Sequence, residues 1–275
     1  MKMTVRQKLN VVFIYFILLV CSIITLLVRC DKIDPFTKSE DATLGIGLMT
    51  FYNILNGNRM MLYCFIGLIL LIPSISCIHF YKYEHNKFAQ SIKVRIGIHR
   101  YKRHALFRSF FYGAAFMSIF LISLLVCVHI FYIPIVFQSN FEYKNYFSNN
   151  ALVNLVIYIL FSSIGLGIYN MFLVSGISFI KNEYVYRVSS LIHLVISLLI
   201  YIGCGPILSS VFETFGKESN TSFVLASFFI PLNLITPGQF QEAEGYLSFF
   251  ISVVFYLLFI YILYKLSIRK ELSNE

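Results

Sequence analysis

The sequence predicts an all-α polytopic membrane protein in which residues 1–275 form a single transmembrane domain. Of the 275 residues, 58% are hydrophobic and only 13% are charged, whereas a soluble domain carries about 25% charged residues. Six apolar runs approach the ~20 residues that cross ~30 Å of hydrocarbon as a helix. Lys and Arg gather between particular runs, which gives the predicted fold an orientation.

Six transmembrane helices are expected, near Leu9–Val28, Met61–Phe80, Phe107–Val136, Leu152–Phe179, Val188–Ile207 and Tyr246–Leu266. The first run follows three basic residues, as the apolar region of a signal peptide would. Its length of roughly 20 residues exceeds the ~7–15 of such a region, and no small-x-small cleavage site follows it. We therefore expect a retained span.

The distribution of basic residues predicts that both termini lie in the cytoplasm. With this N-in, C-in arrangement, 16 Lys and Arg residues fall on inner segments and adjoining helix ends, and 6 fall on outer segments. Positively charged loops are retained on the cytoplasmic side. Because the basic residues adjoin apolar spans, we expect them to contact lipid headgroups and not nucleic acid.

The outer segment between the fifth and sixth spans contains a second kind of apolar element. Ser222–Ile235 is apolar but only 14 residues long, and it is interrupted by Pro231 and followed by Pro237. This run is too short to span and too apolar for a free loop, so it predicts a re-entrant or interfacial hairpin. If it crossed the membrane instead, the last span would be inverted.

The main inner connector lies between Tyr81 and Arg108 and carries eight Lys and Arg residues. A helix is favoured over a strand, although the residues from Ile92 to His99 also alternate like a strand. It would run through Glu84–Arg103 or end at Gly97. The helix could lie along the headgroups or bind a soluble partner. It would align on one face Phe88, Ile92, Ile96 and His99. A shorter inner connector, Lys181–Arg187, joins the fourth and fifth spans.

These features together resemble the ABC-2 class of ABC-transporter permeases. The resemblance covers most of the chain and rests on six spans, inner termini, the outer hairpin broken by Pro231, and a connector of the form Glu84…Arg95-x-Gly97-x-x-Arg100 that leads into the third span. In that family the first inner connector carries a coupling helix that docks on a separate ATPase subunit.

The resemblance implies a permease subunit that moves an amphipathic peptide or lipid-like substrate, with export as the expected direction, across a bacterial plasma membrane. Its partners would be an ABC ATPase, which binds ATP and Mg²⁺, and a second copy of the chain or a paralogue; the chain itself would bind no cofactor. The implied partner-binding residues are Glu84, Phe88, Ile92, Arg95, Gly97 and Arg100, with Glu183 and Arg187 in the second connector. Permeases of this size are common in bacteriocin and lantibiotic immunity systems.

Four polar side chains fall inside predicted spans, where facing lipid would be costly. They are His129, Asn154, Asn170 and His193. They could line a substrate path, or they could form interhelical hydrogen bonds, which contribute ~0.6 kcal/mol on average. Small residues at Ser109 and Gly113, and at Ser163 and Gly167, have the spacing that permits close helix packing or dimer contact.

Other function classes lack their motifs. No Asp or Glu lies deep in a predicted span, which argues against a proton- or sodium-coupled carrier. The six cysteines form no CxxC pair, so neither a disulfide framework nor a metal site is expected. The chain has no Walker A motif and no intramembrane protease motif, so we do not expect an enzyme. A membrane scaffold or toxin-immunity protein that does not transport remains the alternative.

Overall fold

The computed structural model describes residues 5–30, 45–54, 69, 77–137, 147–148, 150–214, 230–237 and 245–273. These residues are largely helical, and no strand occurs among them. In chain order the helices are α1 (Val5–Cys30), α3 (Ile46–Ile54), α5 (Ile78–Glu84), α6 (Lys87–Ile96), α7 (Ile98–Phe131), α8 (Ala151–Ser175), the 3₁₀ turn η2 (Ile177–Phe179), α9 (Glu183–Arg187), α10 (Ser189–Thr214), α12 (Pro231–Ile235) and α13 (Gly245–Leu272).

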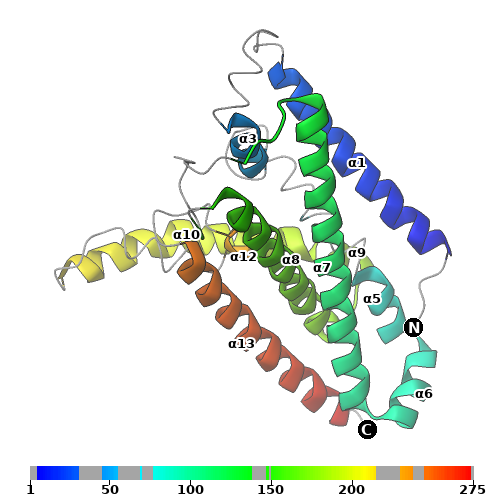
Figure 1. The fold of residues 1–275 in the computed structure, drawn as a ribbon. Helices are drawn as coiled ribbons and strands as arrows, with labels where there is room; N and C mark the ends of the chain where they lie inside the picture. The colour runs from blue at the N-terminus through cyan, green and yellow to red at the C-terminus, as the bar shows by residue number, and fades with distance from the viewer. Residues whose placement is uncertain are drawn as a thin grey trace.

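Helix α8 is the centre of the fold. It packs along α7 and also contacts α13 and α12, while α1 and α3 pack against α7 (Figure 1). In this view α1 and α7 run upwards along the chain, whereas α8 and α13 run downwards. The second half of α8 is buried on nearly every side, from Gly165 to Asn170, so this helix can tolerate few changes of side-chain volume.

Small residues allow α7 and α8 to approach closely, as the sequence predicts. A Cβ atom added at Gly167 would lie 2.7 Å from Cδ2 of Phe110, and one at Gly113 would lie 2.9 Å from the carbonyl oxygen of Leu166. At the same interface the Ser118 hydroxyl donates to Ser163 Oγ at 2.7 Å. These residues therefore serve packing within one chain.

Three helices among the described residues are long and apolar enough to cross a membrane: Ile98–Phe131, Ala151–Phe179 and Phe249–Leu272. They correspond to the third, fourth and sixth predicted spans, and they indicate a membrane protein. The first and fifth predicted spans coincide with α1 and α10, whose apolar parts are shorter in the residues searched, and α10 runs across the direction of α7 (Figure 1). Most of the second predicted span, Met61–Phe80, lies outside the described residues.

Two of these helices extend beyond their predicted apolar boundaries. α7 begins at Ile98, before the predicted Phe107, and α13 continues past Leu266 to Leu272. The added turns contain Lys, Arg and Leu, which favour helix, and no Pro or Gly that would end it. With 34 residues, α7 is roughly 51 Å long, more than one hydrocarbon layer requires.

The described part of the predicted outer hairpin is α12, which begins at Pro231. Proline is favoured in the first helical turn because its missing N–H would have no partner there. All five α12 residues are buried, and its backbone crosses α8 at Gly165, where an added Cβ would overlap the Leu234 carbonyl oxygen. Residues 222–229 of the hairpin lie outside the described residues.

The main connector is helical, so the strand alternative for residues 92–99 is wrong. Of the two predicted helix ends the structure has the one at Gly97, where α6 stops. The helix is not continuous with Glu84, because α5 ends there and a turn at His85 and Asn86 precedes α6. Gly97 has φ +81°, a conformation that side chains disfavour. His99 consequently belongs to α7 and does not extend the predicted face of α6.

We predict that Gly165→Ala lowers the stability of the fold by about 1–3 kcal/mol, because the added methyl group pushes α12 away from α8. The measurement is the thermal unfolding midpoint in detergent, followed by far-ultraviolet circular dichroism. Gly203→Ala is the matched control, since a Cβ at this helical glycine meets no atom within 4 Å. An equal response of the two variants would contradict this packing.

Candidate functional site

Four charged side chains from four helices meet at one end of the molecule. Lys93 Nζ of α6 lies 2.8 Å from Glu84 Oε1 of α5 and 3.0 Å from Glu271 Oε1 of α13. Lys102 Nζ of α7 lies 2.5 Å from the same Glu271 oxygen. We call these four residues the charged cluster, and their formal charges sum to zero.

The turn at Gly97 makes the cluster possible. The amide of Gly97 donates to the Lys93 carbonyl at 2.8 Å, and the Tyr101 amide donates to the Gly97 carbonyl at 3.0 Å, so α6 ends and α7 begins at this residue. Because the chain changes direction here, Lys93 and Lys102 both reach Glu271 although they lie on different helices. Lys93 also lies 5.4 Å from the ring centre of Tyr101.

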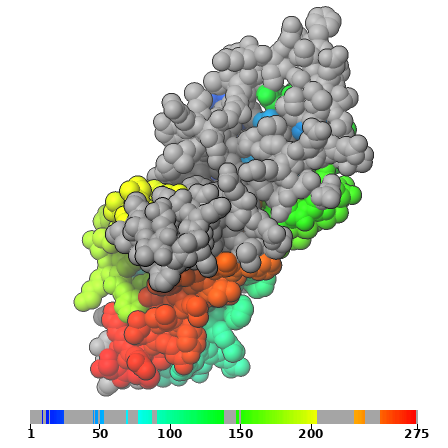
Figure 2. Space-filling model, turned by 90° about the vertical axis from the view of Figure 1, so that its left-hand side faces the viewer, coloured from blue at the N-terminus to red at the C-terminus, as the bar shows by residue number. Residues whose placement is uncertain are grey.

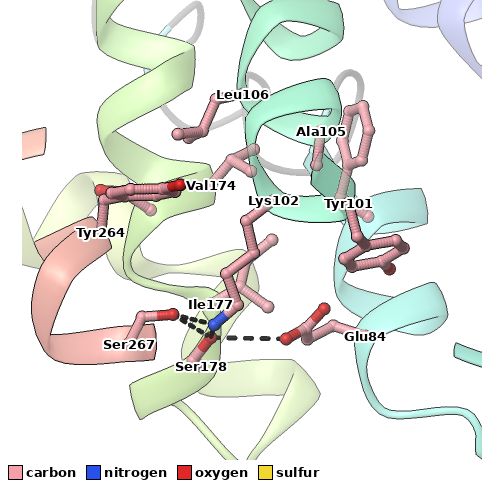
Figure 3. Close-up of a pocket in the computed structure, with 12 residues that line it drawn as sticks. Glu84, Tyr101, Lys102, Ala105, Leu106, Val174, Ile177, Ser178, Tyr264 and Ser267 are labelled. Carbon is pink, nitrogen blue, oxygen red and sulfur yellow. Dashed lines mark hydrogen bonds between the residues drawn. The ribbon is translucent and has the colours of Figure 1, made fainter. Parts of the chain in front are cut away.

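Two serine hydroxyls complete the coordination of Lys102. Its ammonium group donates to Ser178 Oγ at 3.2 Å and to Ser267 Oγ, and these hydroxyls lie 3.0 Å from each other (Figure 3). Ser178 Oγ also donates to Glu84 at 3.4 Å, and Lys270 donates to the Ser178 carbonyl oxygen. The 3₁₀ turn η2 after α8 is therefore connected to α5, α7 and α13.

Burial and pairing act in opposite directions on Lys93. Burial alone would lower the pKa of its ammonium group, since a low dielectric disfavours the charged form. The hydrogen bonds and negative charges of Glu84 and Glu271 outweigh burial, so the pKa of Lys93 lies above its ordinary value. The cluster therefore holds Lys93 in its charged form throughout the physiological range.

A small hollow adjoins the cluster. In Figure 3 its lower wall carries Lys102, Ser178 and Glu84, and its upper wall carries Leu106 and Val174. Tyr264 approaches from α13, and its hydroxyl lies 3.2 Å from Nδ1 of His99. The hollow thus separates a charged wall from an apolar wall that leads towards the interior of α7 and α8.

The second inner connector lies at the same end. Tyr81 of α5 stacks on Tyr186 of α9 with 4.9 Å between ring centres, and its hydroxyl donates to the Lys181 carbonyl oxygen at 2.5 Å. Glu183 accepts a hydrogen bond from Arg187 at 2.7 Å and lies 3.6 Å from Lys82. The hydrogen bond from Arg187, followed by the charge of Lys82, lowers the pKa of the Glu183 carboxyl.

The six predicted partner-binding residues of the first connector have different surroundings. Glu84 is largely buried in the charged cluster, and Gly97 forms the turn. Arg95 and Arg100 are exposed, whereas Ile92 is partly buried. The side chain of Phe88 lies outside the described part of the chain. The exposed arginines are thus the members of this set that a partner could reach directly.

The four polar residues of the predicted spans do not come together. Asn154 and Asn170 are 16 positions apart on α8, which is roughly 24 Å along a helix. Asn154 bonds to the Phe147 amide and the Tyr52 hydroxyl, and Asn170 donates to the Ser109 carbonyl of α7.

The two histidines of this set are equally separate. His129 is exposed near the end of α7 and accepts a hydrogen bond from the Ile135 amide at 3.0 Å. His193 of α10 lies against Tyr169, Phe172 and Tyr256. The hydrogen bonds of the two asparagines agree with the interhelical interpretation of the sequence, and the described contacts join none of the four into one path.

Sequence reasoning missed Lys93, Lys102, Glu271, Ser178 and Ser267 as site residues. For the charged residues, the sequence feature that could have indicated a site is their place just beyond an apolar run. Lys102 comes before the third span in this way, and Glu271 comes after the sixth. That pattern says that the residue lies near a membrane boundary, but not which charge it meets. The pairing required the three-dimensional arrangement of α5, α6, α7 and α13.

Among the residues that the structure describes, no group of three or more His, Cys, Asp or Glu side chains is placed to hold a metal ion. No family model, no curated protein and no solved structure matches the chain. The interpretation of the site therefore rests on its geometry.

We predict that Lys93→Met lowers the thermal unfolding midpoint in detergent. It leaves two carboxylates with Lys102 as their shared cation, and breaking a buried pair in this way costs on the order of 3 kcal/mol. The matched control is the double variant Lys93→Met/Glu84→Leu, which removes one charge of each sign and leaves Lys102 with Glu271. The double variant should be more stable than the single one, and additive losses would show that the pair is not coupled.

Proposed function

We propose that the chain is the transmembrane permease subunit of an ABC transporter. It would pair with a second copy or a paralogue and with ATPase subunits that carry ATP and Mg²⁺. The observation that supports this proposal best concerns α6: one side of this helix contacts the other helices, and the other side is exposed.

The exposed side of α6 has the composition of a protein-binding surface. Val94 is 83% exposed and Ile96 is 44% exposed, and Arg95 lies between them. Arg100 follows on the first turn of α7 and is also exposed. Exposed apolar side chains flanked by arginine are typical of interfaces, and a partner that presented acidic and apolar groups would complement them.

The side of α6 that contacts the other helices could transmit a movement of α6 to them. Lys93 joins α6 to α5 and α13 through contacts of 2.8 and 3.0 Å, and Lys102 joins α13 to α7 at 2.5 Å. α7 in turn packs closely on α8. A partner that displaced α6 during ATP hydrolysis would therefore move the ends of the apolar helices.

The second connector supports the same proposal. α9 packs against α5, so the short connector and the long one meet at one end of the molecule. One ATPase subunit could then contact both Arg187 and Arg95. The substrate would be amphipathic, because the outward faces of the apolar helices offer aromatic and aliphatic side chains with few charges.

We predict that the chain, purified from its native cells in mild detergent, retains a nucleotide-binding ATPase subunit. The double variant Arg95→Glu/Arg100→Glu should lose that subunit and its ATPase activity, because reversed charges repel an acidic partner surface. Its unfolding midpoint should stay near that of the wild type, since neither arginine belongs to the charged cluster. The readouts are mass spectrometry of the co-purified proteins and ATP turnover.

The variant Arg95→Lys/Arg100→Lys keeps both charges and is the matched control, with retention of the subunit expected. Full retention by the Glu variant would exclude this face of α6 as the docking surface. Absence of any nucleotide-binding protein from the wild-type preparation would reject the permease proposal and favour a membrane scaffold or toxin-immunity protein.

A further inference from the structure

Two apolar helices, α7 and α13, each carry at one end a row of exposed side chains that changes from aromatic to basic. On α7, Phe111 and Phe107 are followed towards the helix start by Arg103 and Arg100, at spacings of three and four residues. All four side chains are exposed. Positions three and four apart share one face of a helix, so α7 carries an aromatic stretch that gives way to a basic one.

The row on α13 runs towards the end of that helix. Tyr261, Lys265 and Arg269 are four residues apart, and all three are exposed. The Lys265 ammonium lies 5.6 Å from the ring centre of Tyr261. The exposed positions on the preceding turns of this face, Val254 and Leu258, are apolar.

The fold brings the basic ends of the two rows to one level. Lys102 of α7 and Glu271 of α13 are in contact, and Nδ1 of His99 lies 3.2 Å from the Tyr264 hydroxyl. The start of α7 and the end of α13 lie side by side at the lower end of the molecule in both views (Figures 1 and 2). Figure 2 also shows the second half of α13 uncovered at the surface.

The charge of the rows is not balanced within the described residues. Arg103, Lys265 and Arg269 form no ion pair with another described side chain, whereas the four charges of the cluster between the helices neutralise one another. The outward surface at this level therefore carries net positive charge, directly next to apolar helix surface.

We propose that three basic residues of these rows, Arg103, Lys265 and Arg269, bind the phosphate headgroups of anionic phospholipids in the leaflet at this end of the molecule. Phe107 and Tyr261 would lie at the boundary of the acyl chains, while Arg103, Lys265 and Arg269 extend to the phosphates. Long basic side chains bury their stems in apolar surroundings and keep the charge at the interface. Each Lys or Arg near an anionic lipid surface adds attraction.

The continuous apolar surface identifies the occupant as lipid. These charges follow long stretches of exposed apolar side chains on two helices that are long and apolar enough to cross a membrane, and lipid is what covers such a surface. The proposal also fixes the depth of the protein. The charged cluster would lie level with the headgroups.

The test uses vesicles of equal parts phosphatidylcholine and phosphatidylglycerol. Wild-type protein is reconstituted and extracted into mild detergent, and its retained lipids are quantified by mass spectrometry. Phosphatidylglycerol should be enriched among them. In Arg103→Gln/Lys265→Gln/Arg269→Gln the enrichment should disappear, with a loss of up to about fivefold for each charge removed.

The charge-conserving variant Arg103→Lys/Lys265→Arg/Arg269→Lys should keep the enrichment, and Arg95→Gln, outside the rows, should not change it. If the triple Gln variant does not fold, the three single variants should each show a partial loss. Equal retention of the two lipids by the wild type would overturn the proposal, and so would release of phosphatidylglycerol by millimolar inorganic phosphate. The readout needs no ATPase, so it is independent of the proposed transport function.

Discussion

The arrangement of this protein depends on the pairing of Lys93 and Lys102 with Glu84 and Glu271. Each charge alone would be costly near apolar helices, because moving an ion out of water loses several kcal/mol of solvation. Three contacts of 2.5 to 3.0 Å between the two lysines and the two glutamates act against that loss. The cluster therefore exists only when four separate helices occupy their places together, and it specifies how those helices meet.

Close packing has the complementary role away from the cluster. Gly113 and Gly167 let the backbones of α7 and α8 approach, and Gly165 admits the backbone of α12. Lipid is as apolar as the helices, so association within a bilayer depends on such packing and on hydrogen bonds like that of Asn170. Small residues thus allow α7, α8 and α12 to pack closely, and the ionic contacts of the charged cluster attach α6 to these packed helices.

Much of the local structure could be predicted from the sequence. Long apolar runs predicted α7, α8 and α13, and the glycine in a basic segment predicted the turn at Gly97. Local pattern carries such features because hydrophobicity and backbone preference act within a few residues. The ion pair between Lys93 and Glu271 could not be predicted, since 178 positions separate them. The asparagine at position 170 was ambiguous for the same reason, because its partner Ser109 lies on another helix.

The central claim is that the charged cluster holds α6 in a fixed position relative to the bundle. The most direct measurement is double electron–electron resonance between nitroxides at Val94→Cys and Tyr261→Cys, with the native cysteines replaced by alanine. Both sites are exposed, one on α6 and the other on α13. The account predicts one narrow distance distribution that broadens when Lys93 is changed to Met. An identical narrow distribution in the Lys93→Met protein would contradict it.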